Sequence, residues 1–214
     1  MKPGLRLQGD AAVSSPKLRE TASGDPVDVA VGRRLRALRQ GRGLSLEKVA
    51  ARTGLSIGFV SQVERGLSSP SLRVLALLAD TLETGIGGLF EPGGTDRDPI
   101  VVSERDRPEL RLWRAGITKQ LLTPVSGTRG LSLFRTVLEP GASTGADLFT
   151  HDGEEAGLVL EGRLTLVVET RTLHLAEGDG FRFASRRPHR FGNPSARARA
   201  VVLWVNAICA NADA

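Results

Sequence analysis

The sequence predicts an α + β protein of two domains: a bundle of five short helices, then a small antiparallel β-sandwich or barrel. Up to about residue 90, apolar residues recur at helical spacing between serines and glycines that can end helices. Residues 91–99, EPGGTDRDP, are rich in Pro, Gly and Asp and are typical of a linker. From residue 100, short apolar runs alternate with Gly, Pro and Asp, a pattern that favours antiparallel strands.

Composition places the chain among ordinary globular proteins, with 214 residues, 40% hydrophobic and 25% charged. Cys209 is the only cysteine, which excludes an intrachain disulfide and fits a reducing compartment. No apolar run approaches the ~20 residues that span a bilayer, and the first residues lack the apolar stretch of a secretion signal. We therefore expect a cytoplasmic protein with a flexible tail (1–27), a helical domain (28–90), a linker (91–99) and a β domain (100–214).

Helix ends are marked locally. Ser45, Ser56 and Ser71 can each accept a hydrogen bond from a free backbone N–H at a helix start. Gly54 stands where the chain must turn sharply and a positive φ costs glycine little. The five predicted helices cover about residues 28–40, 46–53, 56–65, 72–82 and 86–90.

Two short helices joined by a tight turn at Gly54 are the arrangement that places a helix in the major groove of DNA. The charge pattern agrees. Residues 1–90 hold 13 Lys and Arg against 8 Asp and Glu, whereas residues 91–214 hold 16 of each. The excess of positive charge therefore coincides with the helical motif, as a phosphate-binding surface requires.

Residues 31–90 resemble the helix-turn-helix domain of the XRE family, which is related to phage repressors. The matching pieces are RRLRALRQGRGLSLEKVAARTGLS (33–56), VSQVERG (60–66) and SPSLRVLALLADTL (69–82). The resemblance implies that Arg39 pairs with Glu64 as a structural ion pair rather than reading DNA.

We expect the helix around residues 56–65 to read base edges. Gln62 can pair bidentately with adenine, Ser56 and Ser61 can donate or accept, and Ile57 or Phe59 can touch a thymine methyl group. A second set is expected to hold phosphates and to fix register without reading sequence: Lys48, Arg52, Arg65, Ser69 and Ser71.

The second half offers eight predicted strands, covering residues 100–103, 110–113, 131–138, 157–160, 164–169, 172–175, 180–183 and 199–205. Two segments here, PGASTGADLFTHDGEEAGLVLEG (140–162) and GDGFRFASRRPHRFGN (178–193), resemble the paired motifs of the cupin family. The resemblance implies a small jelly-roll barrel over residues 105–207. It maps His151, Glu155 and His189 onto the family's ligand positions, with Phe149 where a further histidine is usual.

Two interpretations of the three residues His151, Glu155 and His189 stay open. Two imidazoles and a carboxylate can bind a divalent metal (Zn, Fe or Ni) with open positions, or they can form a metal-free polar cluster in a ligand pocket. Phe149 either fills core volume or forms an apolar wall of that pocket, which we favour. His174, between Leu173 and Leu175, is expected to face outward and is assigned no role.

A helix-turn-helix before a cupin resembles the XRE-cupin regulators of bacteria. It implies a non-enzymatic, sequence-specific transcriptional regulator, dimeric on a palindromic operator and gated by a small molecule or metal in the barrel. The expected partners are double-stranded DNA, a small-molecule effector and a second copy of the chain. The alternatives are a cupin metalloenzyme (oxygenase or isomerase) tethered to the helical domain, and a constitutive DNA-binding dimer whose barrel only joins subunits.

Overall fold

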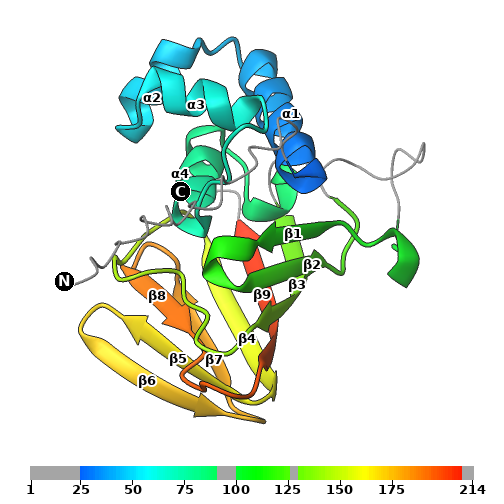
Figure 1. Ribbon diagram of the computed structural model, residues 1–214, viewed down its shortest axis with the longest axis vertical. Coiled ribbons are helices and arrows are strands. Elements are labelled where there is room, and N and C mark those ends of the chain that lie inside the picture. Colours follow the sequence, from blue (N-terminus) through cyan, green and yellow to red (C-terminus); the bar gives the residue numbers. More distant parts are fainter. Residues whose placement is uncertain (1–24, 91–99, 126–129, 209–214) are drawn as a thin grey trace, which may run out of the picture.

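The computed structural model describes residues 25–90, 100–125 and 130–208, and it places a helical domain on one end of a β-barrel (Figure 1). The expected linker, most of the expected tail and Cys209 lie outside the described residues. Within these ranges, no helix combines the length and the apolar character that crossing a membrane requires.

Each helix of the first domain begins at a capping side chain. Ser45 accepts from Lys48 N, Ser56 from Phe59 N and Ser71 from Val74 N, so the three predicted caps are confirmed. Gly54 ends the second helix at φ +70°, in the left-handed region that the sequence predicted for it. The helices are α1 (Pro26–Gly41), α2 (Leu46–Thr53), α3 (Ile57–Glu64) and α4 (Leu72–Thr81).

Two helix boundaries differ from expectation. Helix α1 begins at Pro26, two residues earlier than predicted, because Asp25 caps it and a proline suits the first turn. The predicted fifth short helix is present as a single 3₁₀ turn, η1 (Ile86–Leu89), so four of the five are α-helices. Its glycines explain the difference: a Cβ on Gly87 would lie 2.1 Å from Oγ of Ser132 in the barrel, so the close contact excludes better helix formers.

The barrel consists of a six-stranded sheet, in the order β1-β2-β3-β9-β4-β7, and a three-stranded sheet, β6-β5-β8, with antiparallel pairing throughout. Phe134, Leu164 and Trp204, all fully buried, form its core between the two sheets. The nine strands and two 3₁₀ turns are β1 (Glu109–Leu112), β2 (Ile117–Leu121), β3 (Gly130–Leu138), β4 (Glu154–Glu161), β5 (Arg163–Val168), β6 (Arg171–Ala176), β7 (Gly180–Ala184), β8 (His189–Gly192), β9 (Ala200–Ile208), η2 (Glu104–Asp106) and η3 (Trp113–Ala115).

The strand predictions need three corrections. Residues 100–103 form no strand: Ile100 and Val101 are 89% and 77% exposed, and no strand edge among the described residues pairs with them. Conversely, β2 and β8 were not predicted, because Thr118, Lys119 and Arg190 interrupt their apolar runs. Both strands owe their formation to neighbours in the sheet rather than to their own composition.

The two domains share one continuous hydrophobic core. The ring of Phe90 lies 6.2 Å from that of Phe134 in β3, and η1 packs against the same strand through Gly87. From α1, Arg34 donates to the carbonyl of Gly88 in η1 at 2.9 Å. Helix α4 and η1 therefore cover the end of the barrel that faces the helical domain (Figure 1).

Candidate functional site

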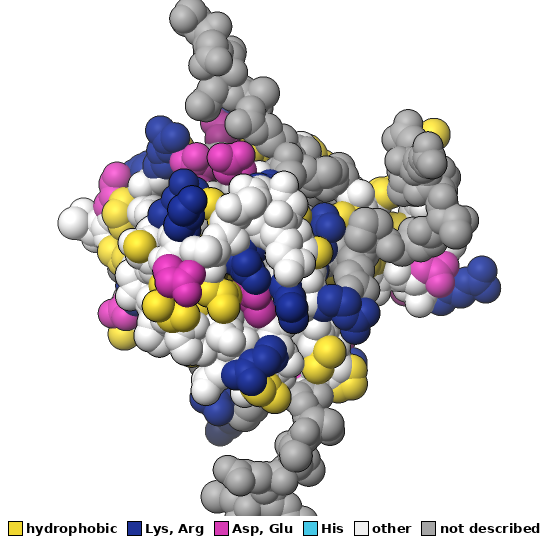
Figure 2. All heavy atoms as spheres, turned by 90° about the horizontal axis from the view of Figure 1, so that it is seen from above, with side chains coloured by type: hydrophobic (Ala, Val, Ile, Leu, Met, Phe, Trp, Pro, Cys, Tyr) yellow, Lys and Arg dark blue, Asp and Glu magenta, His cyan; other side chains and the backbone are white. Residues whose placement is uncertain are grey.

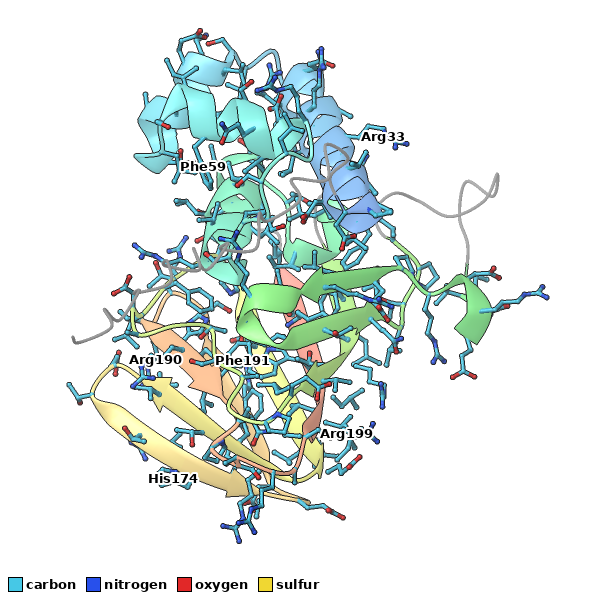
Figure 3. All side chains as sticks on the ribbon, in the orientation of Figure 1. Arg33, Phe59, His174, Arg190, Phe191 and Arg199 are labelled. Carbon is cyan, nitrogen blue, oxygen red and sulfur yellow. The ribbon has the colours of Figure 1, made fainter. Side chains whose placement is uncertain are left out.

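The helix-turn-helix consists of α2 and α3 with the turn at Gly54 between them. Val60 and Val63 bury one side of α3, which leaves Ile57 46% exposed and Gln62 exposed on the other side. Ser61 is half-buried. Phe59 is half-buried and packs against the core at the margin of the exposed face, as predicted, and Figure 3 labels it there.

The predicted phosphate contacts differ in how free their side chains are. Lys48 and Arg52 are exposed on α2, whereas Arg65 donates from Nε to the carbonyl of Ser61. The side-chain oxygen of Ser71 is already engaged, because it caps α4. Ser69 donates its hydroxyl hydrogen to the carboxylate of Asp28, so this side chain ties the loop to α1.

Positive charge is concentrated on this domain. Residues 29–73 hold nine Lys and Arg against Glu47 and Glu64. Figure 2, which looks down on the helical domain, shows Lys and Arg side chains spread over the face, with fewer acidic ones among them. Six of the nine basic residues are exposed: Arg33, Arg36, Lys48, Arg52, Arg65 and Arg73.

Arg39 and Glu64 form the ion pair that the resemblance implied. Nε of Arg39 lies 2.6 Å from Oε1 of Glu64, and Nη2 lies 2.9 Å from Oε2. Both side chains are largely buried, at 12% and 8% exposure. They therefore join α1 to α3 inside the helical domain.

A second site lies in the barrel, beneath the helical domain. A small cavity is lined by aromatic, aliphatic and polar side chains. Three of the lining residues belong to the helical domain, Leu72 and Ala76 in α4 and Ile86 in η1. The remaining lining residues come from the barrel: Lys119, Phe149, His151, Glu155, Phe191, Trp204 and Asn206.

Glu155 is the centre of a hydrogen-bond network in this cavity. Its Oε1 accepts from Nε2 of His151 at 2.6 Å and from Nδ2 of Asn206 at 3.2 Å. Its Oε2 accepts from Nε1 of Trp204 at 2.8 Å. Burial alone would raise the pKa of the Glu155 carboxyl, but the histidine rings of His151 and His189 hold that pKa well below its ordinary value.

The same carboxylate fixes the state of His151. Burial lowers the pKa of this imidazole, but the hydrogen bond to Glu155 and the attraction of the Glu155 charge together outweigh burial, so the net pKa is raised. His189 is fully buried in β8; its Nδ1 lies 2.8 Å from the carbonyl of Arg187, and its Nε2 lies 3.5 Å from Oε1 of Glu155. His151 and Glu155 therefore form a charge-assisted pair, with the His189 ring beside them.

The predicted ligand set converges. One donor atom each from His151, Glu155 and His189 can be chosen so that all three lie within 4.8 Å of one another. Nε2 of His189 is buried and has no hydrogen-bond partner among the described residues, so a lone pair is available there. Two imidazole nitrogens and one carboxylate suit Zn, Fe or Ni, and these three side chains can hold a divalent metal with open positions.

Phe149 does both things that the sequence left open. It is 6% exposed, and its ring centre lies 4.4 Å from that of His189, so it fills core volume. It also lines the cavity. A backbone bridge to His189 brings it beside β8, so an apolar ring occupies the place of the usual further histidine.

Sequence reasoning missed the cavity residues from the helical domain and four from the barrel: Lys119, Phe191, Trp204 and Asn206. Lys119 could have been found by alternation, because Ile117, Lys119 and Leu121 occupy the inward positions of β2. The same alternation along β9 places Trp204 and Asn206 inward. His174 is exposed on β6, as predicted (Figure 3), and the second-motif arginines Arg182, Arg186 and Arg187 form exposed ion pairs.

Comparison with known proteins supports both halves of the chain. A model of the helix-turn-helix domain matches residues 30–88, and a model of the cupin domain matches residues 134–206. The HTH-type transcriptional regulator PuuR of Escherichia coli is 31% identical over 169 residues, which cover 78% of this chain and 90% of PuuR. The regulator SutR of the same organism is 28% identical, covering 74% of this chain and 84% of SutR.

A solved structure agrees with the arrangement of the domains. The crystal structure of an HTH_3 family transcriptional regulator from Vibrio cholerae superposes with a TM-score of 0.67 at 25% identity, covering 86% of this chain and 98% of that one. The order of the domains, the helix-turn-helix and the barrel are thus shared. The chain belongs to the HTH-type transcriptional regulators that join an N-terminal helix-turn-helix domain to a C-terminal cupin domain.

Proposed function

We propose that the protein is a dimeric, sequence-specific transcriptional regulator of the cytoplasm, whose affinity for DNA changes with the content of the barrel cavity. One observation carries the gating: Leu72, Ala76 and Ile86 of the helical domain are part of the cavity wall. A molecule entering the cavity contacts α4 directly. Helix α4 packs against α2 of the helix-turn-helix, so a shift of α4 changes how the reading helix is presented.

Base reading is assigned to α3. Gln62 is the exposed amide in the middle of the reading face, with Ser61 and Ile57 beside it. Ser56 keeps its hydroxyl hydrogen for DNA while its oxygen caps the helix, and Phe59 adds an apolar edge. Lys48, Arg52 and Arg65, with the loop at Ser69 and Ser71, lie on the elements flanking α3 and are assigned to phosphates.

The outer face of the six-stranded sheet is the proposed dimer interface. Phe134 and Trp204 face the core, so their chain neighbours Leu133 and Leu203 face outward. Leu158 pairs with Leu203 on the adjacent strand and therefore faces outward too. Leu131, Leu158 and Leu160 are 55%, 38% and 44% exposed there. A twofold dimer through this face doubles the base contacts and reads a palindrome.

Selection of duplexes from a random library by the full chain tests the regulator function. The expected result is a palindromic consensus whose half-sites lie about one helical turn apart. Enrichment of no sequence would favour a protein that does not read DNA.

The metal-binding set motivates a metalloenzyme as the second candidate. The metalloenzyme requires that the purified protein contains stoichiometric iron and that His189→Ala loses this iron. It also requires that the protein consumes O₂ when a substrate is added. The third candidate, a constitutive dimer, requires that filling the cavity leaves DNA affinity unchanged. We favour the regulator because the cavity wall is shared with the DNA-binding domain.

A further inference from the structure

Lys119 is a buried cation whose hydrogen-bonding capacity is unused. Its side chain belongs to the inward face of β2 and the residue is 3% exposed. Nζ lies 4.9 Å from the ring centre of Phe134, 5.1 Å from that of Trp204 and 5.9 Å from that of Phe191. Aromatic faces attract the positive charge but accept no conventional hydrogen bond.

The ammonium group borders the cavity. Among the residues that the structure describes, no oxygen or nitrogen accepts a hydrogen bond from Nζ, although Lys119 lines the cavity with Glu155 and Asn206. Glu155 attracts the charge but uses its own oxygens for other donors. An ammonium at the cavity wall with no protein acceptor can donate to a bound anion.

Asn206 provides the complementary group. Its orientation is fixed, since the carboxylate of Glu155 can only accept and Nδ2 must therefore be the atom that faces it. Oδ1 is then buried, and no donor within the described part of the chain reaches it. Trp204, whose ring contacts Nζ of Lys119, is two residues before Asn206 on the same face of β9.

The cavity is small, and its lining limits the charge of what it can hold. Lys119 is the single Lys or Arg in the lining. One buried positive charge matches a monoanion, whereas a dianion such as phosphate would leave a second charge unpaired.

We propose that the cavity binds a small carboxylate that carries a neighbouring hydroxyl or amino group. The carboxylate accepts from Nζ of Lys119, the hydroxyl or amino group donates to Oδ1 of Asn206, and the carbon chain lies against Phe149 and the wall formed by α4. This inference rests on the proposed function, because it names the class of effector that enters the gating cavity.

Tryptophan fluorescence of the full chain tests this inference. The chain has two tryptophans, so Trp113→Phe leaves Trp204, in the cavity wall, as the reporter. The probes are lactate, propionate, which lacks the hydroxyl, lactamide, which lacks the charge, and inorganic phosphate. We expect saturable binding of lactate with a Kd of about 1 mM. Propionate should bind several-fold more weakly, lactamide at least tenfold more weakly, and phosphate not measurably.

Two variants in the Trp113→Phe background locate the site. Lys119→Met removes the charge at similar length and should weaken lactate binding at least tenfold. Ala76→Leu extends the wall into the cavity and should weaken both carboxylates without removing Lys119. A far-UV spectrum and binding to random duplex DNA show that each variant is folded.

Three results would overturn the carboxylate site: no saturable response of the parent up to about 100 mM lactate, equal responses in the parent and in Lys119→Met, or tighter binding of phosphate than of lactate. The DNA measurement separates this inference from the proposed function. If carboxylates fail to bind while the chain still selects a DNA sequence, the effector class is wrong and the regulator remains. If no DNA sequence is selected, the regulator itself is wrong whatever binds in the cavity.

Discussion

Arg39 and Glu64 join α1 to α3 through two parallel contacts, Nε to Oε1 at 2.6 Å and Nη2 to Oε2 at 2.9 Å. The remaining guanidinium nitrogen, Nη1, donates to the carbonyl of Leu44 at 2.8 Å, just before α2. One arginine therefore links α1 to α3 and to the residues that precede α2. Because the pair is largely buried, its loss leaves an uncompensated charge in the domain.

Glu64→Ala should lower the free energy of unfolding by about 3 kcal/mol, since it strands the Arg39 guanidinium. Urea denaturation followed by circular dichroism measures the change. Asp147→Ala is the matched control, because it breaks the exposed ion pair with Arg73 and should cost less than about 1 kcal/mol. Equal losses in the two variants would contradict the structural role of the buried pair.

Sequence reasoning succeeded in the helical domain because its signals are local. Ser45, Ser56 and Ser71 each cap the helix that follows them, and these residues can be recognised without any tertiary contact. The 3₁₀ form of the fifth helix has a non-local cause: Gly87 in η1 is required by Ser132, which lies 45 positions further along the chain. Helix propensities, which depend on the local sequence, cannot predict that contact.

In the barrel, the resemblance located one part of the site, whereas the pattern of apolar residues missed another. The resemblance located His151, Glu155 and His189, which the fold brings within 4.8 Å of one another. Lys119 was missed because a lysine in a short apolar run looks like the end of a strand. The pairing of β2 with β3 places Lys119 opposite Thr136 inside the barrel, where Lys119 is buried.

Gln62→Ala should weaken binding to the selected operator about tenfold or more while leaving binding to random duplex unchanged, because it removes a base contact. Arg52→Ala on α2 should weaken binding to both duplexes and lower the salt dependence of log K by about one unit per site. Fluorescence anisotropy at several salt concentrations measures both effects. If Gln62→Ala weakened both duplexes equally, Gln62 would not read bases.

Lys119 should make stability depend on alkaline pH. Burial lowers the pKa of Lys119 to about 8 in the folded chain, against 10.5 for the ordinary side chain, and the nearby Glu155 opposes this only in part. Between these two values the unfolded chain holds a proton that the folded chain has lost, so the free energy of unfolding rises with pH. Below pH 8 the buried charge of Lys119 lowers the free energy of unfolding by its full amount. About 3 kcal/mol of this loss is recovered as the pH approaches 10.5.

Urea denaturation of the parent and of Lys119→Met at pH 7 to 10.5 isolates this effect, because the two proteins share every other group that titrates in that range. Lys119→Met should be the more stable protein at pH 7, and the difference should shrink as the pH rises. A difference that stays constant with pH would mean that Lys119 remains protonated in the folded chain.

Leu158→Glu should convert a dimer into a monomer, since it places a charge on the outer face of the six-stranded sheet. Light scattering after size-exclusion chromatography measures the mass. His174→Glu, exposed on the other sheet, is the control and should leave the mass unchanged. A monomeric parent protein, or a dimer that survives Leu158→Glu, would contradict this choice of interface.

The most direct test of gating is the affinity of Ala76→Leu for the selected operator. The larger side chain enters the cavity from α4 and imitates an occupied site without touching DNA. Ala37→Leu, the same change at an exposed position of α1, is the control. If the cavity controls the helix-turn-helix, Ala76→Leu changes the operator Kd by at least about fivefold and Ala37→Leu leaves it unchanged. A folded Ala76→Leu protein with the parent's operator affinity would contradict gating through α4.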